Sequence, residues 1–202
     1  MNTDKPPRTS ARQRLLAAAG ELFYENGINT VGIDRIIEHA GVAKASLYDC
    51  FGSKEELVRA YLQERSEVRR ARIDERLARF TDPIDQILAI FDLLGELSAE
   101  PDYRGCAFAR ASADASASDK VKSAVRESRA YILEKFTDLC RLAGARAGGE
   151  AADPVLLAKQ LVLLYDGATT AAYLDGNRNA AATARALAVQ VLVLHNLTAK
   201  KY

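Results

Sequence analysis

The stretch that decides the fold runs from Gly32 to Phe51 and reads Gly-Ile-Asp-Arg-Ile-Ile-Glu-His-Ala-Gly-Val-Ala-Lys-Ala-Ser-Leu-Tyr-Asp-Cys-Phe. Apolar residues recur at helical spacing on both sides of Gly41, so the pattern predicts two short helices joined by a tight turn. Glycine permits a backbone conformation at this turn that a larger side chain would resist. Four apolar side chains can form the small core that fixes the angle between the helices: Ile36, Ala40, Val42 and Leu47. Two helices joined in this way are the unit that places a helix in the major groove of DNA.

Helical patterns continue on both sides of this stretch. A first helix is expected from an N-cap at Thr9 or Ser10 to Gly27. Ser53 and Glu56 have the spacing of a capping box that opens a long helix ending near residue 80. The remaining helices are expected to begin at Pro83 and to cover about 105–114, 118–145, 154–174 and 179–198. Because no run of strand periodicity competes, we expect an all-α fold of about nine helices.

Bulk composition leaves the binding partner open. The 202 residues carry a formal net charge of +1, so overall electrostatics do not by themselves indicate nucleic acid. Four basic residues precede the first apolar run: Lys5, Arg8, Arg12 and Arg14. These residues can meet phosphates or form a solvated terminus, and the pattern does not choose between the two.

Several functional classes are disfavoured by the sequence. Cys50, Cys106 and Cys140 are too widely spaced for a disulfide framework or a metal cluster, and they suit a reducing cytosol. The only histidines, His39 and His195, form no metal-binding pair, and no glycine-rich phosphate loop is present, which argues against a helical-bundle enzyme. No signal sequence or membrane-spanning apolar stretch is visible. We therefore expect a cytoplasmic protein that is not an enzyme, does not contact a membrane, and needs no metal or cofactor.

The residues from Gly27 to Val58 resemble the N-terminal region of the TetR family of transcriptional regulators. The features that carry the resemblance are Gly27, Ile36, Ala40-Gly41-Val42, Leu47-Tyr48, Phe51 and Ser53-Lys54-Glu55-Glu56-Leu57. The resemblance implies a three-helix DNA-binding domain at residues 1–56, with its helix-turn-helix motif at 32–51. It also implies a helical domain at 57–202 that binds an effector and dimerises. The function it implies is that of a regulator, most simply a repressor, whose dimer binds a palindromic operator and is released by an unidentified small molecule.

Five residues are expected to anchor the protein on double-stranded DNA. By resemblance, Tyr48 and Lys54 contact phosphates, and their hydroxyl and ammonium groups suit that role. Lys44, early in the recognition helix, can reach a phosphate or a guanine edge. Thr30 and Gly32, near the start of the second helix, can offer hydroxyl or backbone donors to phosphate.

Three further residues are expected on the outer face of the recognition helix. Ser46 can exchange hydrogen bonds with bases, and Ala45 can pack against a thymine methyl group. Asp49 and Cys50 depart from the family pattern, in which an aromatic residue or histidine is usual. Asp49 can accept from a cytosine amino group but is unfavourable over phosphate. These departures keep open an alternative, namely a helical ligand-binding protein that has lost specific DNA binding.

Polar side chains on the expected helix 154–174 are candidates for effector binding. Tyr165, Thr169 and Tyr173 recur every four residues, and Asp166 lies beside them. On an otherwise aliphatic helix, they turn towards a cavity or a partner helix, or are satisfied by neighbouring backbone groups. Other candidates lie on segments that line the pocket in the family: Phe91, Tyr103, Cys106, Phe108, Arg110 and Tyr131.

The last two helices carry aliphatic and small residues around most of their circumference. The residues concerned in the last helix are Ala184, Leu187, Ala188, Val191, Leu192 and Leu194. A helix of this kind needs burial on two sides. Packing against the same two helices of a second subunit would provide it, so we expect a homodimer.

Overall fold

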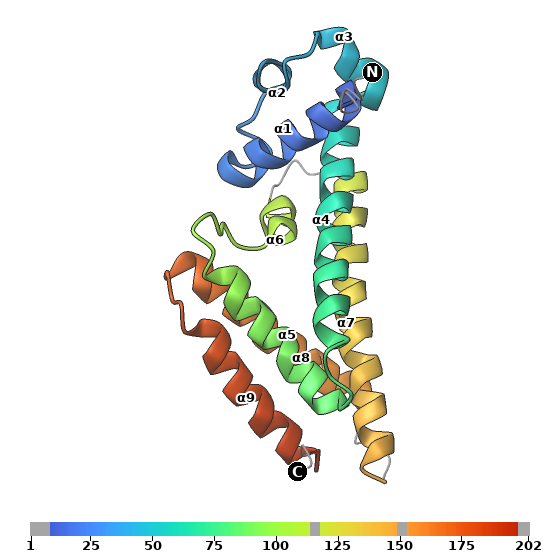
Figure 1. Ribbon diagram of the computed structural model, residues 1–202, viewed down its shortest axis with the longest axis vertical. Helices are drawn as coiled ribbons and strands as arrows, with labels where there is room; N and C mark the ends of the chain where they lie inside the picture. The colour runs from blue at the N-terminus through green and yellow to red at the C-terminus, as the bar shows by residue number, and fades with distance from the viewer. Residues whose placement is uncertain (1–8, 114–117, 149–152, 198–202) are drawn as a thin grey trace, which may run out of the picture. The chain divides into compact units, whose positions relative to one another are not determined.

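A computed structural model describes residues 9–113, 118–148 and 153–197, and within these ranges the chain forms nine helices and no strand (Figure 1). The expected all-α class is thereby confirmed. The helices are α1 (Ala11–Asn26), α2 (Ile33–Ala40), α3 (Lys44–Phe51), α4 (Lys54–Leu77), α5 (Pro83–Ser98), α6 (Ala107–Ser112), α7 (Asp119–Arg146), α8 (Pro154–Leu174) and α9 (Ala180–Leu194). Among the described residues, no helix is both long and apolar enough to cross a membrane.

Local capping explains where several helices begin and end. Ser10 caps α1 through a capping box, in which its hydroxyl accepts from the N–H of Gln13 at 3.2 Å. Gly27 ends α1 with a φ of 86°, a value that favours glycine. The long helix α4 ends at Leu77, slightly before the expected residue 80. The next helix is capped by Asp82 in an extended conformation, as a residue before proline requires, so the connecting segment must leave the helix earlier.

The described residues group into two compact units. One consists of residues 1–65 and 107–125, and the other of residues 66–106 and 126–202. Both α4 and α7 run from one unit into the other, and α6 belongs to the first. The division into functional domains at residues 1–56 and 57–202 stays a prediction, because compactness does not report the role of each part.

The core of the first unit is formed by the helices around the Gly41 turn. α1 packs against both α2 and α3. The apolar stripe of α1 (Leu15, Ala19, Leu22 and Phe23) is buried, and so are Ile36 of α2, Leu47 of α3 and Leu57 of α4. Burial of one such side chain stabilises the fold by about 1.5–3 kcal/mol. The orientation of α3 is therefore set by a shared apolar core.

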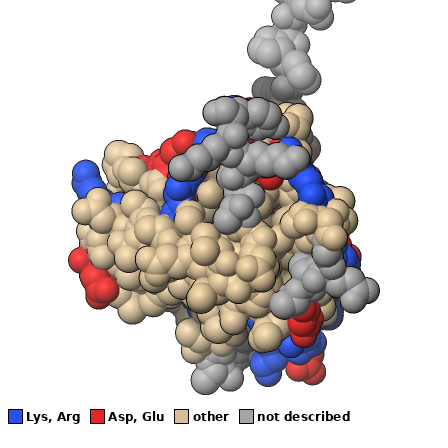
Figure 2. Space-filling view, turned by 90° about the horizontal axis from the view of Figure 1, so that it is seen from below, with Lys and Arg blue, Asp and Glu red and all other residues tan. Residues whose placement is uncertain are grey.

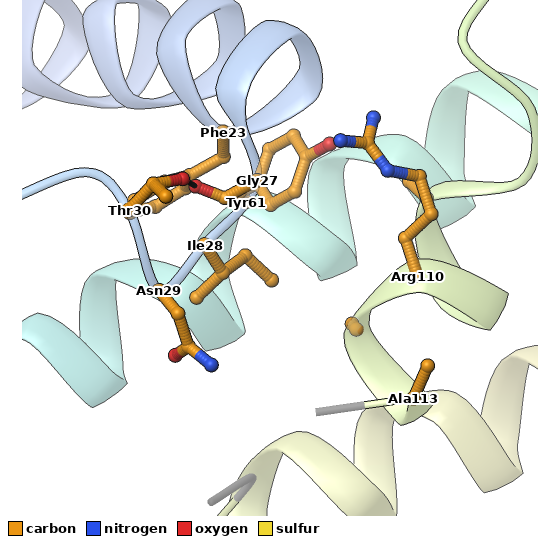
Figure 3. A pocket seen from close by; sticks show the side chains of 10 residues that line it. Phe23, Gly27, Ile28, Asn29, Thr30, Tyr61, Arg110 and Ala113 are labelled. Atoms are coloured by element: carbon orange, nitrogen blue, oxygen red, sulfur yellow. Dashed lines mark hydrogen bonds between the residues drawn. The ribbon is translucent and has the colours of Figure 1, made fainter. Parts of the chain in front are cut away.

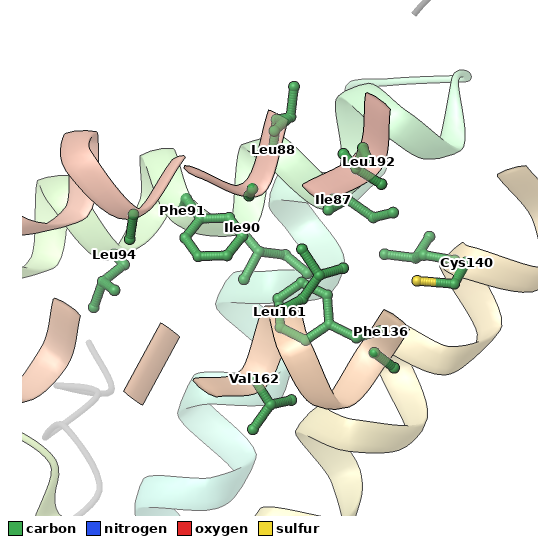
Figure 4. Packing of buried hydrophobic residues seen from close by; sticks show 14 of the residues in the cluster. Ile87, Leu88, Ile90, Phe91, Leu94, Phe136, Cys140, Leu161, Val162 and Leu192 are labelled. Carbon is green, nitrogen blue, oxygen red and sulfur yellow. The ribbon is translucent and has the colours of Figure 1, made fainter. Parts of the chain in front are cut away.

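The second unit has a larger core, to which α5, α7, α8 and α9 contribute (Figure 4). Phe91 of α5 lies beside Phe136 of α7, with 5.9 Å between their ring centroids. Leu161 of α8 and Leu192 of α9 are also buried there. The thiol of Cys140 is part of this core, and burial raises its pKa to about 12. Cys140 is therefore a packing residue with an unreactive thiol.

Candidate nucleic-acid interface

The turn between α2 and α3 is held by hydrogen bonds from two directions. Gly41 has the left-handed conformation (φ 61°, ψ 44°), and its N–H donates to the carbonyl of Glu38 at 3.1 Å. The Nη1 of Arg14, on α1, donates to the carbonyl oxygens of Gly41 at 3.0 Å and of Ala40 at 3.4 Å. Carbonyl groups at a helix C-terminus carry partial negative charge, so the guanidinium stabilises this end of α2.

Of the other three basic residues that precede the first apolar run, one lies in the part of the chain that the structure describes and two do not. The guanidinium of Arg12 lies 5.0 Å from the ring centroid of Phe51, at the end of α3. Lys5 and Arg8 lie outside the described residues. Arg12 and Arg14 therefore both connect α1 to the helix-turn-helix.

α3 has a buried inner face and an exposed outer face. Leu47 and Phe51 are buried against the rest of the unit, whereas Lys44, Ala45 and Asp49 are exposed. The N-cap of α3 is Ala43, which offers no side-chain cap. The first N–H groups of α3 can therefore meet a phosphate oxygen or a base edge.

Three other side chains of α3 are partly or largely accessible. Tyr48 keeps 46% of its surface exposed, a large fraction for an aromatic residue. Ser46 and Cys50 are half-buried. The structure thus places Tyr48 on the same side as Lys44, Ala45 and Asp49, with Ser46 at the edge of that surface.

Lys44 has an acidic partner on the neighbouring helix. Its ammonium donates to the carboxylate of Asp34 on α2 at 3.0 Å, and both side chains are exposed. This hydrogen bond raises the pKa of Lys44. Asp34 was not among the expected site residues, and its place at the start of α2 gave no sign that it would reach Lys44.

Lys54 and Thr30 meet at the loop between α1 and α2. The ammonium of Lys54 donates to the carbonyl of Ile28 at 2.8 Å. The hydroxyl of Thr30 is within hydrogen-bond distance of the carbonyl of Gly27, at 3.1 Å, and also of that of Asn26. Gly32 is the exposed N-cap residue of α2 and provides no side-chain cap. Lys54 and Thr30 therefore have defined roles in shaping this loop, and their phosphate contacts stay predictions.

The two histidines have simple surroundings. His39 is exposed, with its Nε2 2.8 Å from a carboxylate oxygen of Glu21 on α1. His195, at the end of α9, lies 3.1 Å from the side-chain oxygen of Gln160. Among the described residues, no group of three histidine, cysteine, aspartate or glutamate side chains is arranged to hold a metal ion.

Several of the effector-binding candidates lie close together in the second unit. The Tyr165 ring centroid lies 6.4 Å from that of Phe91 and 6.4 Å from that of Phe136. Burial raises the pKa of Tyr165 to about 12, so its hydroxyl is neutral at physiological pH. The hydroxyl of Tyr103 donates to the carbonyl of Thr169 at 3.3 Å, and the hydroxyl of Thr169 donates to the carbonyl of Tyr165 at 2.8 Å.

The remaining candidates of this unit are spread around that group. Asp166 forms an ion pair with Arg129 at 2.8 Å. Tyr131 has the guanidinium of Arg70 4.4 Å from its ring centroid. Tyr173 packs against Gly105, where an added Cβ would lie 2.9 Å from the Tyr173 ring. Cys106 is half-buried.

Phe108 and Arg110 lie elsewhere, on α6 in the first unit. A cavity of about 250 Å³ is present there, and Figure 3 shows the side chains that line it. Its wall includes Phe23, Ile28, Asn29, Thr30, Tyr61 and Arg110. Arg110 also donates to the carbonyl of Tyr24, the residue two before the end of α1, at 2.6 Å. The expected effector residues are therefore divided between the two units.

Large aliphatic side chains are exposed on α8 and α9. Leu163 and Leu174 of α8 are each 70% exposed, and Leu194 of α9 is 81% exposed. Figure 2 shows a face of the molecule on which uncharged residues predominate. Of the six residues expected at a partner, Leu187 and Leu194 are exposed, Val191 is half-buried, and the other three pack inside the unit: Ala184, Ala188 and Leu192.

Comparison with known proteins identifies relatives of both the N-terminal region and the whole chain. Residues 15–61 match the family model described as bacterial regulatory proteins, tetR family. A TetR-family transcriptional regulator from Streptomyces coelicolor is similar over 92% of this chain and 95% of its own, with 32% identity and a TM-score of 0.82.

Two curated relatives match only part of the chain. The transcriptional activator FasR of Mycolicibacterium smegmatis is 47% identical over 57 residues, which are 28% of this chain and 26% of that protein. The transcriptional regulator LmrA of Bacillus subtilis is 34% identical over 97 residues, 47% of this chain and 52% of that protein. The chain thus spans about half or less of the length of these curated relatives.

Proposed function

This chain belongs to the TetR family of bacterial transcriptional regulators, and on that premise we propose that it binds a palindromic operator as a homodimer, represses transcription and is released by a small-molecule effector. Membership of a family of regulators sets aside the helical-bundle enzyme. Such a regulator acts on DNA in the cytoplasm, in agreement with the scattered, unpaired cysteines.

The observation that carries the proposal is the exposed outer face of α3. Its inner residues, Leu47 and Phe51, are buried, and Arg14 donates to the carbonyl of Gly41 in the turn, so packing and a hydrogen bond support the helix. A recognition helix needs such support because direct contacts with bases require defined side-chain positions. Lys44 and Tyr48 supply a cation and a hydroxyl on this surface.

We assign the contacts as follows. Tyr48 and Lys54 bind phosphates together with the hydroxyl of Thr30 and the backbone at Gly32, and these contacts set the register. Lys44 exchanges Asp34 for a phosphate or a guanine edge when DNA is present. The remaining outer residues of α3 read base edges or methyl groups: Ala45, Ser46 and Asp49.

The aliphatic surface of α8 and α9 supports the proposed dimer. Covering Leu163, Leu174 and Leu194 with a second copy removes that surface from water. A two-fold dimer would place two α3 helices in successive major grooves, about 34–36 Å apart.

The effector acts through the second unit in this proposal. The aromatic and hydroxyl groups around Tyr165 suit a ligand with an apolar body and a few polar atoms. Such a ligand releases DNA if it prefers a conformation in which the two α3 helices are wrongly spaced. FasR is an activator by name, so the direction of regulation needs its own measurement.

The second candidate, a ligand-binding protein without specific DNA binding, is favoured by Asp49 on the outer face of α3. A carboxylate is repelled by the phosphate backbone and is useful only opposite a donor such as a cytosine amino group. The two functions differ in one respect that is easily measured, namely whether the protein prefers its own upstream DNA to random DNA.

The test is a double substitution, Lys44→Ala with Tyr48→Ala, measured by fluorescence anisotropy on the upstream DNA of the protein's own gene. Loss of a base or phosphate contact at each position should weaken binding by at least about tenfold. The matched control is Lys122→Ala, which removes an exposed lysine of α7 and should leave affinity unchanged. Unchanged affinity in the double variant would overturn the assignment of this surface.

A further inference from the structure

The C-terminal end of α1 carries no basic residue of its own in the last turn. The final carbonyl groups of a helix lack intrahelical donors, and they form the negative end of the helix dipole. Most of the final carbonyl groups of α1 accept a hydrogen bond from a donor outside the helix. The carbonyl of Phe23 accepts from the N–H of Gly27 at 3.0 Å, and the carbonyl of Asn26 accepts from the Thr30 hydroxyl.

The carbonyl of Tyr24 receives its donor from a distant part of the chain. Nη1 of Arg110, 86 residues later on α6, donates to it at 2.6 Å. A guanidinium placed at this end combines a charge-assisted hydrogen bond with a favourable interaction with the dipole. Arg110 therefore caps α1 from another helix of the same unit.

Two neighbouring side chains reinforce this arrangement. Figure 3 shows the guanidinium of Arg110 pointing towards Tyr61 of α4. Tyr61 is buried and packs edge-on against Phe23, with ring centroids 5.6 Å apart. The guanidinium of Arg65 lies 4.4 Å from the ring centroid of Tyr24. Two arginines therefore contact Tyr24 in the last turn of α1.

This turn leads directly into the helix-turn-helix. Residues 27–32 connect it to α2, and Lys54 fastens the same loop through the carbonyl of Ile28. Thr30 and Gly32, both assigned to the DNA surface, lie in this connection. An unrestrained end of α1 would let the loop and the start of α2 move relative to α3.

We propose that Arg110 is a positioning residue for DNA binding: it caps the end of α1 and so orders the loop that presents the helix-turn-helix. The inference rests on the proposed DNA-binding function. In this proposal Arg110 acts in the absence of effector. Substitution of a residue that only binds effector would instead leave the exchange and the DNA affinity of the effector-free protein unchanged.

The first measurement is hydrogen exchange on the full chain without DNA. Arg110→Met keeps the aliphatic stem and removes the donors, and peptides covering residues 22–32 should exchange about tenfold faster. Arg110→Lys keeps a cationic donor and should restore most of the protection. The matched control is Arg141→Met, which breaks a 2.9 Å pair with Asp138 on the same helix and should leave exchange at residues 22–32 unchanged.

The second measurement is anisotropy on the upstream DNA of the protein's own gene, with the same variants. Arg110→Met should weaken binding by about threefold to tenfold, and Arg110→Lys should weaken it less. Should Arg110→Met not fold, Arg65→Met removes the other arginine contact to Tyr24 and should shift both readouts in the same direction.

Three results would overturn the proposal. Unchanged exchange at 22–32 in Arg110→Met would show that Arg110 does not cap α1. Faster exchange throughout the chain, including α8, would show general destabilisation without a positioning role. Unchanged DNA affinity despite faster local exchange would separate the cap from DNA binding. If the unsubstituted chain binds no DNA, the proposed function fails together with this role in binding, and exchange at 22–32 still decides whether Arg110 caps α1.

Discussion

Truncating Leu163 and Leu194 to alanine should weaken the proposed dimer. Each truncation removes three carbons, and each buried carbon is worth about 0.8 kcal/mol. The two leucines are 70% and 81% exposed in a single chain, so most of this contribution is available to an interface. A dimer contains four truncated side chains. With half of the exposed part of each covered by the partner, the free energy of association weakens by roughly 3–4 kcal/mol.

About 1.4 kcal/mol changes a dissociation constant tenfold, so this loss should make the dissociation constant of the dimer roughly several hundredfold larger. Sedimentation equilibrium across the micromolar range measures it directly. Both side chains are exposed in one chain, so the helical content by circular dichroism should not change. The matched control is Leu142→Ala on α7, whose side chain is 56% exposed but lies outside α8 and α9.

The reasoning fails if the double variant dimerises as tightly as the unsubstituted chain. It fails equally if Leu142→Ala weakens the dimer as much as the double variant does. Either result would place the interface elsewhere than on the aliphatic surface of α8 and α9.

Two further predictions concern stability. Arg14→Met removes the donor to the carbonyls of Gly41 and Ala40. Because the guanidinium is largely solvated, the free energy of unfolding, measured by urea titration, should fall by only about 1 kcal/mol. The control is Arg79→Met, which breaks an exposed ion pair with Glu75, and an equal loss in that variant would contradict the role given to Arg14. Burial raises the pKa of Cys140 and of Tyr165 to about 12 from 9.0 and 10.0, so these groups ionise first in the unfolded chain. Their contribution to stability is complete below about pH 9 and is lost as the pH rises towards 12; a urea midpoint that is equal at pH 8 and pH 10.5 would refute this.

The helices were predictable because their signals are local. The spacing of Leu15, Leu22 and Ile36 marks the buried faces, and Ser10 lies within hydrogen-bond reach of the Gln13 N–H once the first turn forms. Gly27 and Gly41 end their helices because positive φ suits glycine. These effects act over a few residues, so they can be read from the order of the amino acids.

The partners of the basic residues could not be predicted in this way. Arg14, Lys54 and Arg110 all donate to backbone carbonyls 26 to 86 residues away in the chain. A basic side chain looks the same in sequence whether it meets a phosphate or the negative end of a helix. Only the fold shows which carbonyl lies within its reach.

Arg69 and Arg76 of α4 illustrate the same limit. They recur at helical spacing on a helix that also carries acidic residues, and such a pattern is typical of a solvated stripe. In the structure, Arg69 instead donates to the Ser128 carbonyl on α7 at 2.7 Å, and Arg76 pairs with Glu96 on α5. Likewise, the family resemblance that grouped Arg110 with the effector residues contained no information that α6 packs in the first unit.

The most direct test of the central claim compares two DNA duplexes of the same length and composition. One is the protein's own upstream sequence and the other is its shuffled counterpart, with binding followed by anisotropy at a fixed salt concentration. A sequence-specific regulator should prefer the upstream duplex by at least about a thousandfold and saturate it at two chains per palindromic site. Equal affinity for the two duplexes would contradict the account.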